Sequence, residues 1–378
     1  MLPEGMTVCI ATGNLSQRSE TFVRAHLDRL FAGRSVVVAR QVTDEGQAGG
    51  RPVMLHPHRT LLRRFAAAVG AGNPLHRRFR RFAARHRVGF ILAEFGWVGT
   101  DLHQVAWELG IPMFCYFRGS DASRDLSDER YRARLARMFG TIDGIVTVAA
   151  SLRDNLGAHG LTHPRSLVIP SGVDVQRFVA APKDPDLVLS VGRLVPRKSP
   201  LTTIEAFAVA ARRQPHLRLE IIGEGELEGA CRQRIAELGL GQRVHLLGGR
   251  DHDFIAGRMS AAAIYMQHSV TATDGDSEGV PTAIQEAMAA GTAVVSTLHA
   301  GIPEIIEHEQ TGLLVKEHDT DAYAAGLLQL ATNATLRERL ASAAHRFAVA
   351  ELDVVKLHAR LERAILESIA QRRPAFRT

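Results

Sequence analysis

Two glutamates, Glu278 and Glu286, lie eight residues apart in the stretch "DSEGVPTAIQEAMAAG", which spans 276–291. The pattern predicts a buried strand over 263–267, a Gly/Pro loop that holds Glu278, and a helix that holds Glu286. Two such carboxylates could accept hydrogen bonds from different parts of one hydroxyl-rich ligand. The pair is equally explained by a helix-capping Glu278 and a solvated Glu286, because a carboxylate at a helix N-terminus contributes only about 0.3–1 kcal/mol.

Two cations, Arg193 and Lys198, follow another predicted strand in the stretch "VGRLVPRKSP". Cations placed after a buried strand can neutralise a diphosphate and the charge that it gains as a leaving group. The alternative is that both are surface cations of a basic protein. The site predicted from these two stretches would bind a ligand that carries hydroxyls and a diphosphate.

Short apolar runs alternate with helical patterns along the chain, as in buried parallel sheets. Beyond an opening run at 6–11, strands are expected at 35–39, 90–94, 112–117, 144–148, 166–169, 187–191, 217–222, 244–247, 263–267 and 293–296. From about Asp319 onward the pattern is helical. The fold class is therefore α/β, with two doubly wound Rossmann-like domains facing across a cleft in which the ligand binds.

The domain joint is expected at 176–186, where Pro and charged residues interrupt the patterns. Residues 1–178 form the N-terminal domain and 184–355 the C-terminal domain, each Rossmann-like. Residues 356–378 form a C-terminal helix that is expected to pack back on the N-terminal domain.

The composition is that of a globular protein large enough for two domains, with 378 residues, 46% hydrophobic and 23% charged. The N-terminus lacks the pattern of a signal peptide, and no stretch reaches the roughly 18 apolar residues of a membrane span. The three cysteines are far apart, which predicts reduced thiols. We expect a cytoplasmic protein, at most peripheral on the inner face of the plasma membrane.

The net charge of +6 is uneven, since the first 180 residues hold 24 basic and 15 acidic residues. The stretch Arg59–Arg87 carries nine arginines and no acid, with apolar residues interleaved. It predicts contact with an anionic membrane or a polyprenyl-diphosphate-linked acceptor, and the competing interpretation is a solvated helix face. No nucleic acid is expected as a partner, because no nucleic-acid-binding motif accompanies the charge.

The segment "EGVPTAIQEAMAAGTAVVSTLHAGIPEII" resembles the E-x7-E signature of retaining glycosyltransferases of family 4, which have the GT-B fold. Further stretches similar to that family follow in its order across about 300 residues. They are "SETF" (Ser19–Phe22), "EFGWVG" with "IPMFCYFRGSD", "IPSGVD" followed by Phe178, "VGRLVPRKSP" and "GLLV" (Gly312–Val315).

The resemblance implies roles for individual residues. Arg193 and Lys198 would hold the diphosphate of the donor, Glu278 the hydroxyls of the transferred sugar and Glu286 those of the ribose. Arg193, Lys198 and Glu278 would be the catalytic residues. The remaining donor-binding residues implied by the family are Gly13, Arg118, Asp121, Gly192, Gly279, Val280, Pro281 and Thr282, with Pro281 expected as the first helical residue.

One position departs from the family, which commonly has His-Gly-x-Asp where this chain has Arg118-Gly119-Ser120-Asp121. An arginine donates hydrogen bonds but stays protonated, so Arg118 cannot act as a general base. Its role would be hydrogen bonding and charge, or the acceptor differs.

Neither a metal nor a cofactor is expected, apart from the nucleotide-diphosphate sugar as donor substrate. "DGD" (Asp274–Asp276) is similar to a metal-binding pattern of a different glycosyltransferase fold, but here it is interpreted as a loop beside Glu278. "GEGELEG" (Gly223–Gly229) has the wrong spacing for a dinucleotide fingerprint and predicts a tight turn between strand and helix.

The resemblance implies a retaining, metal-independent hexosyltransferase that uses a UDP- or GDP-linked sugar. Its acceptor would be a saccharide or a lipid-linked saccharide in surface polysaccharide or glycoconjugate synthesis. Two alternatives remain open at this point: a nucleotide-sugar 2-epimerase of the same fold, and a non-catalytic protein that binds sugar nucleotides.

Overall fold

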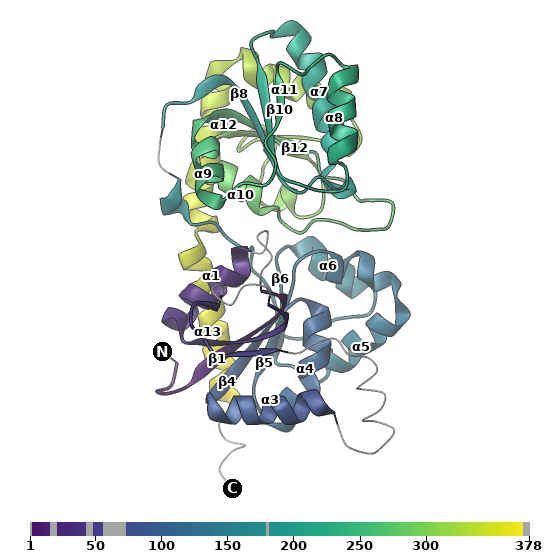
Figure 1. Ribbon diagram of the computed structural model, residues 1–378. Helices are drawn as coiled ribbons and strands as arrows, with labels where there is room; N and C mark the ends of the chain where they lie inside the picture. The colour runs from purple at the N-terminus through teal and green to yellow at the C-terminus, as the bar shows by residue number, and fades with distance from the viewer. Residues whose placement is uncertain (1, 16–20, 43–47, 56–72, 179–180, 373–378) are drawn as a thin grey trace. The chain divides into compact units, whose positions relative to one another are not determined.

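The computed structural model describes residues 2–15, 21–42, 48–55, 73–178 and 181–372 and divides into two compact units (Figure 1). The first unit comprises 1–148, 152–169 and the C-terminal residues from His358 onward. The second comprises 149–151 and 170–357. Each unit has its own parallel sheet, so the predicted pair of Rossmann-like α/β domains is confirmed.

The first unit holds a parallel sheet with the strand order β3-β2-β1-β4-β5-β6-β7. Its strands are β1 (Thr7–Asn14), β2 (Ser35–Gln41), β3 (Val53–Leu55), β4 (Val88–Glu94), β5 (Met113–Phe117), β6 (Gly144–Thr147) and β7 (Ser166–Val168). Its helices are α1 (Thr21–Arg29), η1 (Leu30–Gly33), α3 (Pro74–Arg85), α4 (Gly96–Glu108), η3 (Ser120–Ala122), η4 (Arg124–Ser127), α5 (Glu129–Phe139) and α6 (Ala150–Ala158), whose first residues belong to the second unit. All five residues of β5 are buried, as expected for a strand covered on both faces.

The second unit holds a parallel sheet with the order β10-β9-β8-β11-β12-β13. Its strands are β8 (Asp184–Val191), β9 (Arg218–Ile222), β10 (Val244–Leu246), β11 (Ala262–Met266), β12 (Ala293–Thr297) and β13 (Leu313–Val315). Its helices are η5 (Val175–Arg177), η6 (Pro196–Lys198), α7 (Pro200–Arg213), α8 (Glu228–Glu237), α9 (His252–Ala261), α10 (Thr282–Ala289), η7 (Ile302–Glu304), α11 (Thr320–Thr332), α12 (Ala334–Phe347) and the π-helical turn η8 (Ala348–Leu352). Its core includes Phe207 and Ile264, both fully buried.

The last helix, α13 (Val354–Arg372), begins in the second unit and continues in the first. In the first unit it lies beside α1, where the rings of His26 and His358 are 5.0 Å apart (Figure 1). Glu362 accepts a 2.5 Å hydrogen bond from the Phe31 backbone, and Gln371 accepts one of 2.6 Å from Arg165. Among the described residues, no helix is both long and apolar enough to cross a bilayer.

The segment "GEGELEG" is a loop that leads from β9 into α8. A Cβ atom on Gly223 would lie 1.9 Å from the carbonyl oxygen of Gly192, and one on Gly225 would lie 2.3 Å from that of Leu194. The backbone therefore crosses directly over the loop that follows β8. These glycines serve close backbone packing.

The structure differs from the sequence-based expectation at a few element boundaries. The strands β3 and β13 were not predicted, whereas β7 and β10, which are also three residues long, were predicted. β8 begins at Asp184, inside the segment expected to join the domains. Pro281 is the N-cap residue of α10, with an extended ψ of 124°, and Thr282 is the first helical residue.

Candidate functional site

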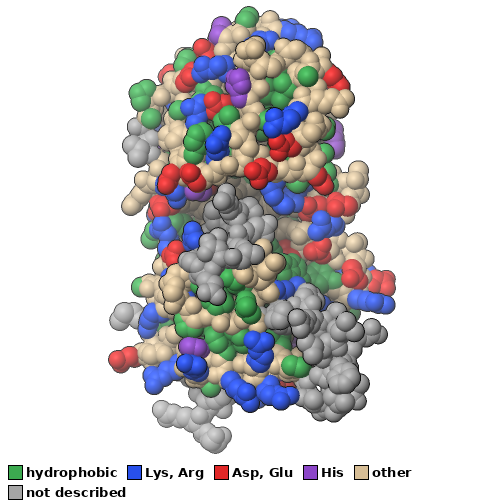
Figure 2. Space-filling model, viewed as in Figure 1, with side chains coloured by type: hydrophobic (Ala, Val, Ile, Leu, Met, Phe, Trp, Pro, Cys, Tyr) green, Lys and Arg blue, Asp and Glu red, His purple; other side chains and the backbone are tan. Residues whose placement is uncertain are grey.

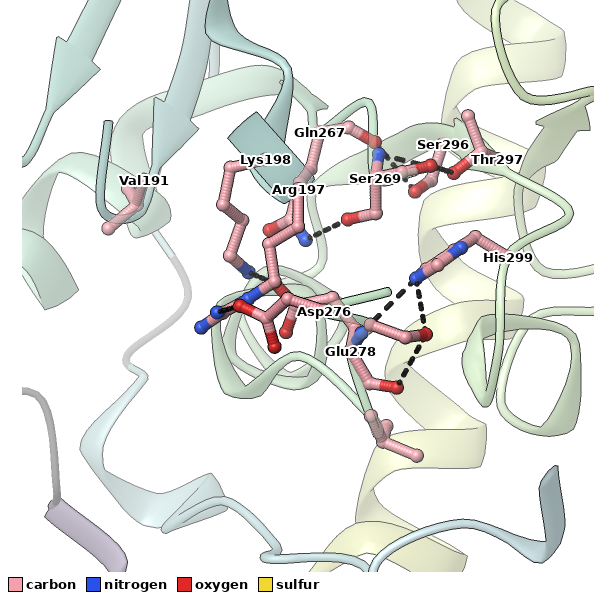
Figure 3. A network of polar contacts seen from close by, with 12 residues as sticks. Val191, Arg197, Lys198, Gln267, Ser269, Asp276, Glu278, Ser296, Thr297 and His299 are labelled. Carbon is pink, nitrogen blue, oxygen red and sulfur yellow. Dashed lines mark hydrogen bonds and ion pairs between the residues drawn. The ribbon is translucent and has the colours of Figure 1, made fainter. Parts of the chain in front are cut away.

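A cluster of opposite charges lies in the loops that follow β8 and β11 in the second unit (Figure 3). The Lys198 Nζ and the Arg197 Nε lie 3.0 and 2.9 Å from the same oxygen of Glu278. A terminal nitrogen of Arg197 also contacts the Asp276 carboxylate. Parallel strands bring these loops to one edge of the sheet, where ligands of this fold class bind.

The local backbone explains how Arg197 and Lys198 come to point at Glu278. Pro196 begins the short helix η6, and Ser199 then adopts a left-handed conformation with φ 38°. This sharp turn separates η6 from α7, and the Ser199 and Thr202 hydroxyls lie 2.7 Å apart beside it. The Arg197 carbonyl accepts a 2.9 Å hydrogen bond from the Val270 backbone, which ties this turn to the loop after β11.

The electrostatic environment keeps Glu278 ionised. Burial alone would raise the pKa of the Glu278 carboxyl, but the charges and hydrogen bonds of Lys198 and Arg197 lower it to about 2. Burial lowers the pKa of Lys198, and the nearby Glu278 charge opposes that effect. A carboxylate with so low a pKa is a poor general base near neutral pH, but it accepts hydrogen bonds from hydroxyl groups.

The structure places the other predicted residues of this unit around the cluster. Arg193 is exposed and lies close enough for its charge to lower the pKa of Lys198. A Cβ on Gly192 would lie 3.5 Å from the Cε of Lys198, so the lysine stem runs along Gly192. The Oε1 of Glu286, on α10, lies 2.9 Å from the Nε2 of His252.

Both predicted glutamates influence the pKa of one buried side chain, Tyr265. The hydroxyl of Tyr265 donates to the Val191 carbonyl over 3.1 Å, and burial raises its pKa. The charges of Glu286 and Glu278 raise that pKa further. Both carboxylates therefore disfavour ionisation of the same buried hydroxyl.

The predicted backbone donors Gly279, Val280 and Thr282 lie at the start of α10. Gly279 and Val280 are buried and Thr282 is half-buried. Its N-cap residue, Pro281, supplies no side-chain hydrogen bond to the first turn. The N–H groups of that turn are suited to an anionic or hydroxyl-bearing ligand.

The sequence reasoning did not single out three residues that contact Glu278 or its ion-pair partner, namely Arg197, Asp276 and His299. Arg197 directly precedes Lys198, so its position in "PRK" was the available signal. Asp276 was considered only as half of a metal pattern, whereas it pairs with Arg197. Among the described residues, no group of three or more His, Cys, Asp and Glu side chains is placed to hold a metal ion.

In the first unit, Arg118 lies in a buried ion pair with Glu94. The Nε and one terminal nitrogen of Arg118 donate to one Glu94 oxygen over 2.8 and 2.6 Å, and His26 contacts the other oxygen. Burial would raise the pKa of Glu94, but the charges of Arg118 and His26 lower it from 4.5 to about 2. The guanidinium also lies 3.7 and 3.9 Å from the ring centroids of Phe22 and Tyr116.

Asp121 is fully buried and engaged with the backbone. One oxygen accepts from the N–H groups of Arg118 and Gly119, each over 3.0 Å, and the other accepts from that of Gly96 over 2.9 Å. Asp121 therefore joins the loop after β5 to the start of α4. Donor binding by Arg118 and Asp121 remains a prediction.

Gly13 lies beneath an aromatic ring. A Cβ atom at this position would lie 2.1 Å from the Cη2 of Trp97, so only glycine permits this approach. The Trp97 ring stacks on Phe95 at 5.2 Å, and the Arg40 guanidinium lies 4.6 Å from its centroid. Contact of Gly13 with the donor remains a prediction. Of the segment "SETF", Ser19 and Glu20 lie outside the described residues.

Comparison with known families shows two matches that follow each other along the chain. Residues 23–177 match the model described as Glycosyltransferase Family 4, and residues 174–347 match that of glycosyl transferases group 1. The crystal structure of HepE from Anabaena in complex with UDP is similar, with a TM-score of 0.79 and 19% identity. That similarity covers 96% of this chain and 100% of HepE, and it supports the fold.

Curated relatives match over part of their length. The amylovoran biosynthesis glycosyltransferase AmsK of Erwinia amylovora is 33% identical over 63% of this chain and 60% of its own. A GDP-mannose-dependent monoacylated alpha-(1-6)-phosphatidylinositol monomannoside mannosyltransferase of Corynebacterium glutamicum is 29% identical over 57% of this chain and 60% of its own. In both comparisons the matched region spans about three fifths of the relative.

We predict that Arg118→Ala lowers the free energy of unfolding by about 3 kcal/mol at pH 7, because Glu94 is left buried without its main partner. The folded pKa of Glu94, about 2, is below its ordinary 4.5. The stabilisation is thus complete above about pH 4.5 and is lost as the pH falls toward 2. Urea unfolding of both proteins at several pH values measures the effect.

The control is the double variant Arg118→Met with Glu94→Gln, which removes both charges and should unfold closer to the wild type than Arg118→Ala does. A single variant as stable as the wild type at pH 7 would contradict the ion-pair assignment.

Proposed function

Because this chain belongs to the GT-B glycosyltransferases of family 4, with a group 1 domain, we propose that it is a retaining, metal-independent hexosyltransferase. Its donor would be a UDP- or GDP-linked sugar, and its acceptor a saccharide or lipid-linked saccharide. The observation that carries this proposal is the cluster in which Arg197 and Lys198 face Glu278.

The proposed chemistry follows from that charge distribution. Lys198, Arg193 and Arg197 hold the donor diphosphate and stabilise the charge that it gains as the sugar leaves. Glu278, ionised near neutral pH, accepts hydrogen bonds from the transferred sugar, and Glu286 accepts those of the ribose. The departing diphosphate helps to deprotonate the acceptor hydroxyl on the same face of the sugar, so that the configuration is retained.

The names of the relatives support the substrate classes. HepE was crystallised with UDP and with UDP-glucose, and the corynebacterial relative is named for GDP-mannose and a phosphatidylinositol acceptor. AmsK is named for amylovoran biosynthesis. These names support a role in surface polysaccharide or glycoconjugate synthesis. The acceptor that we propose is a saccharide or a polyprenyl-diphosphate-linked saccharide, and the place of action that we propose is the cytoplasm.

We further propose that the basic helix α3 contacts anionic lipid at the inner face of the plasma membrane. Arg78, Arg81 and Arg85 on α3 are exposed, and Figure 2 shows Lys and Arg side chains gathered where Figure 1 places this helix. Arg80 pairs with Glu108 of α4 over 2.5 Å. Trp107, the residue before Glu108, is 59% exposed. An exposed tryptophan suits a membrane interface.

Three of the apolar residues interleaved in the basic stretch belong to the core of the first unit. Leu75, Phe79 and Ala83 are buried within the first unit, so only the charged side of the helix is available to lipid. Arg59, Arg63 and Arg64 of the same basic stretch lie outside the described residues. The proposed attachment is therefore electrostatic and sensitive to salt.

We predict that Lys198→Ala lowers turnover about 10²-fold without unfolding the protein, because a preorganised charge on the leaving group is lost. Arg193→Ala should show a loss of the same kind. The matched control is Lys316→Ala, an exposed lysine of the same unit, which should keep wild-type turnover. Initial rates with saturating donor measure turnover, and thermal melts check the fold. Near-normal turnover of both site variants would refute the diphosphate assignment.

We predict an α-linked product from an α-linked nucleotide sugar, formed at full rate in the presence of EDTA. Proton NMR of the anomeric signal reports the configuration, and product analysis separates transfer from the alternatives. A β-linked product would refute retention, and an epimerised or unchanged donor would refute transfer. Inactivation by EDTA that added metal reverses would refute metal independence.

We predict that Arg78→Gln with Arg81→Gln weakens binding to anionic vesicles by about 2 kcal/mol, since each cation near such a surface contributes about 1 kcal/mol. The matched control is Arg212→Gln with Arg213→Gln, which removes the same charge from exposed positions on α7. Co-sedimentation with vesicles, with and without anionic lipid, measures binding. A wild type that stays in the supernatant at low salt would rule out membrane contact.

A further inference from the structure

The loop that carries Glu278 is held at both ends by a chain of hydrogen bonds through two side chains, Glu317 and His299. Figure 3 shows the part of this chain in which His299 points at Glu278. At one end, the Thr271 backbone donates to the Oε2 of Glu317 over 2.9 Å. At the other end, the Glu278 backbone donates to the Nε2 of His299 over 3.2 Å. The Nδ1 of His299 and the Oε1 of Glu317 lie 2.7 Å apart, which closes the chain.

These contacts define the protonation state of His299. Its Nε2 receives a backbone N–H, so this nitrogen must present a lone pair. Its Nδ1 faces a carboxylate oxygen, so that nitrogen must carry the proton. Burial raises the pKa of Glu317, but the hydrogen bonds from His299 and from the Thr271 N–H, together with nearby histidine charges, lower it overall. The arrangement therefore requires a neutral imidazole with its proton on Nδ1.

Protonation of His299 would break this chain at Glu278. An imidazolium carries a proton on each nitrogen, so Nε2 would meet the Glu278 N–H as donor against donor. His299 is 1% exposed, and solvent has little access to replace the lost contact. The Ser277 hydroxyl, 3.2 Å from Nε2, would remain as an acceptor and would draw the ring away from Glu278.

We propose that His299 is a positioning residue that holds Glu278 for catalysis only while it is neutral, with Glu317 selecting the Nδ1–H form. The inference rests on the proposed function for the role of Glu278. The protonation state inferred for His299 does not depend on the proposed function. Glu278 contacts Arg197 and Lys198 through its side chain, so a shift of its backbone moves the acceptor of both cations.

Other titratable groups face His299, and their effects on the pH profile must be distinguished from that of His299. Glu317 and His318 follow β13, and His268 follows β11. Burial lowers the pKa of His268 to about 4, and a charge on His318 lowers it as well. An acid limb that belonged to His268 or to Glu278 would fall near pH 4 or pH 2 and would persist when His299 is replaced.

Three variants test the proposal through the pH profile of kcat. In His299→Gln, the amide oxygen can accept the Glu278 N–H and does not titrate, so kcat should stay within about threefold and lose its acid limb. His299→Leu supplies no acceptor and should lose about tenfold or more in kcat at every pH, with KM for the donor less affected. Glu317→Gln cannot accept from both N–H groups, so it should fall between the two.

The matched control is His318→Asn, which removes the exposed neighbour of Glu317 and suits the left-handed backbone at that position. Its pH profile should equal that of the wild type. Thermal melts of all variants check the fold. An acid limb that persists unchanged in His299→Gln, or full activity in His299→Leu, would overturn the proposal.

A second readout does not depend on enzymatic activity. Long-range proton–nitrogen NMR correlation on protein labelled in its histidines reports which nitrogen carries the proton, and His299→Gln assigns the signal. We expect the Nδ1–H form in the wild type and its loss in Glu317→Gln. An Nε2–H form would refute the inference even in an active enzyme. An inactive protein with the Nδ1–H form would instead refute the proposed function.

Discussion

The ion pairing of Glu278 with Arg197 and Lys198 is the interaction on which the second unit's site depends. A carboxylate that is only 9% exposed persists as an anion because two cations compensate it. The surrounding loops are shaped to hold these partners: Ser199 adopts a left-handed turn, and the Arg197 carbonyl is tied to the loop after β11. In the proposed reaction these cations also hold the diphosphate, so its binding must compete with Glu278 for the same nitrogens.

The first unit also holds a buried carboxylate whose charge is compensated, but by different residues. Glu94, fully buried at the end of β4, is compensated by Arg118 from the end of β5 and by His26 from α1. Stacking of the guanidinium on Phe22 and Tyr116 leaves it little freedom to turn outward. An arginine in place of the family's histidine thus brings a permanent charge to a position where a buried carboxylate requires one.

Much of the fold could be predicted from the sequence, because strands buried on both faces need apolar residues at every position and so stand out as runs. β5 and β11 are of this kind, and both were located to within one residue. The strands β3 and β13 were not identified, and each is defined by its pairing with one neighbouring strand at the edge of its sheet. The glutamate pair, Lys198 and the loop before α10 were identifiable because their local spacing and the resemblance to family 4 both pointed to them.

The sequence alone was enough to predict the two Rossmann-like units, the family and the chemical types of residue at the candidate site. It could not show that Arg197 shares Glu278 with Lys198, that Asp276 is an ion-pair partner, or that His299 and Glu317 hold the Glu278 loop. These contacts join residues 18 to 81 positions apart and exist only when parallel strands bring their loops to one edge of the sheet. Tertiary structure decided them, because the protonation and orientation of a buried polar group depend on neighbours that no local pattern encodes.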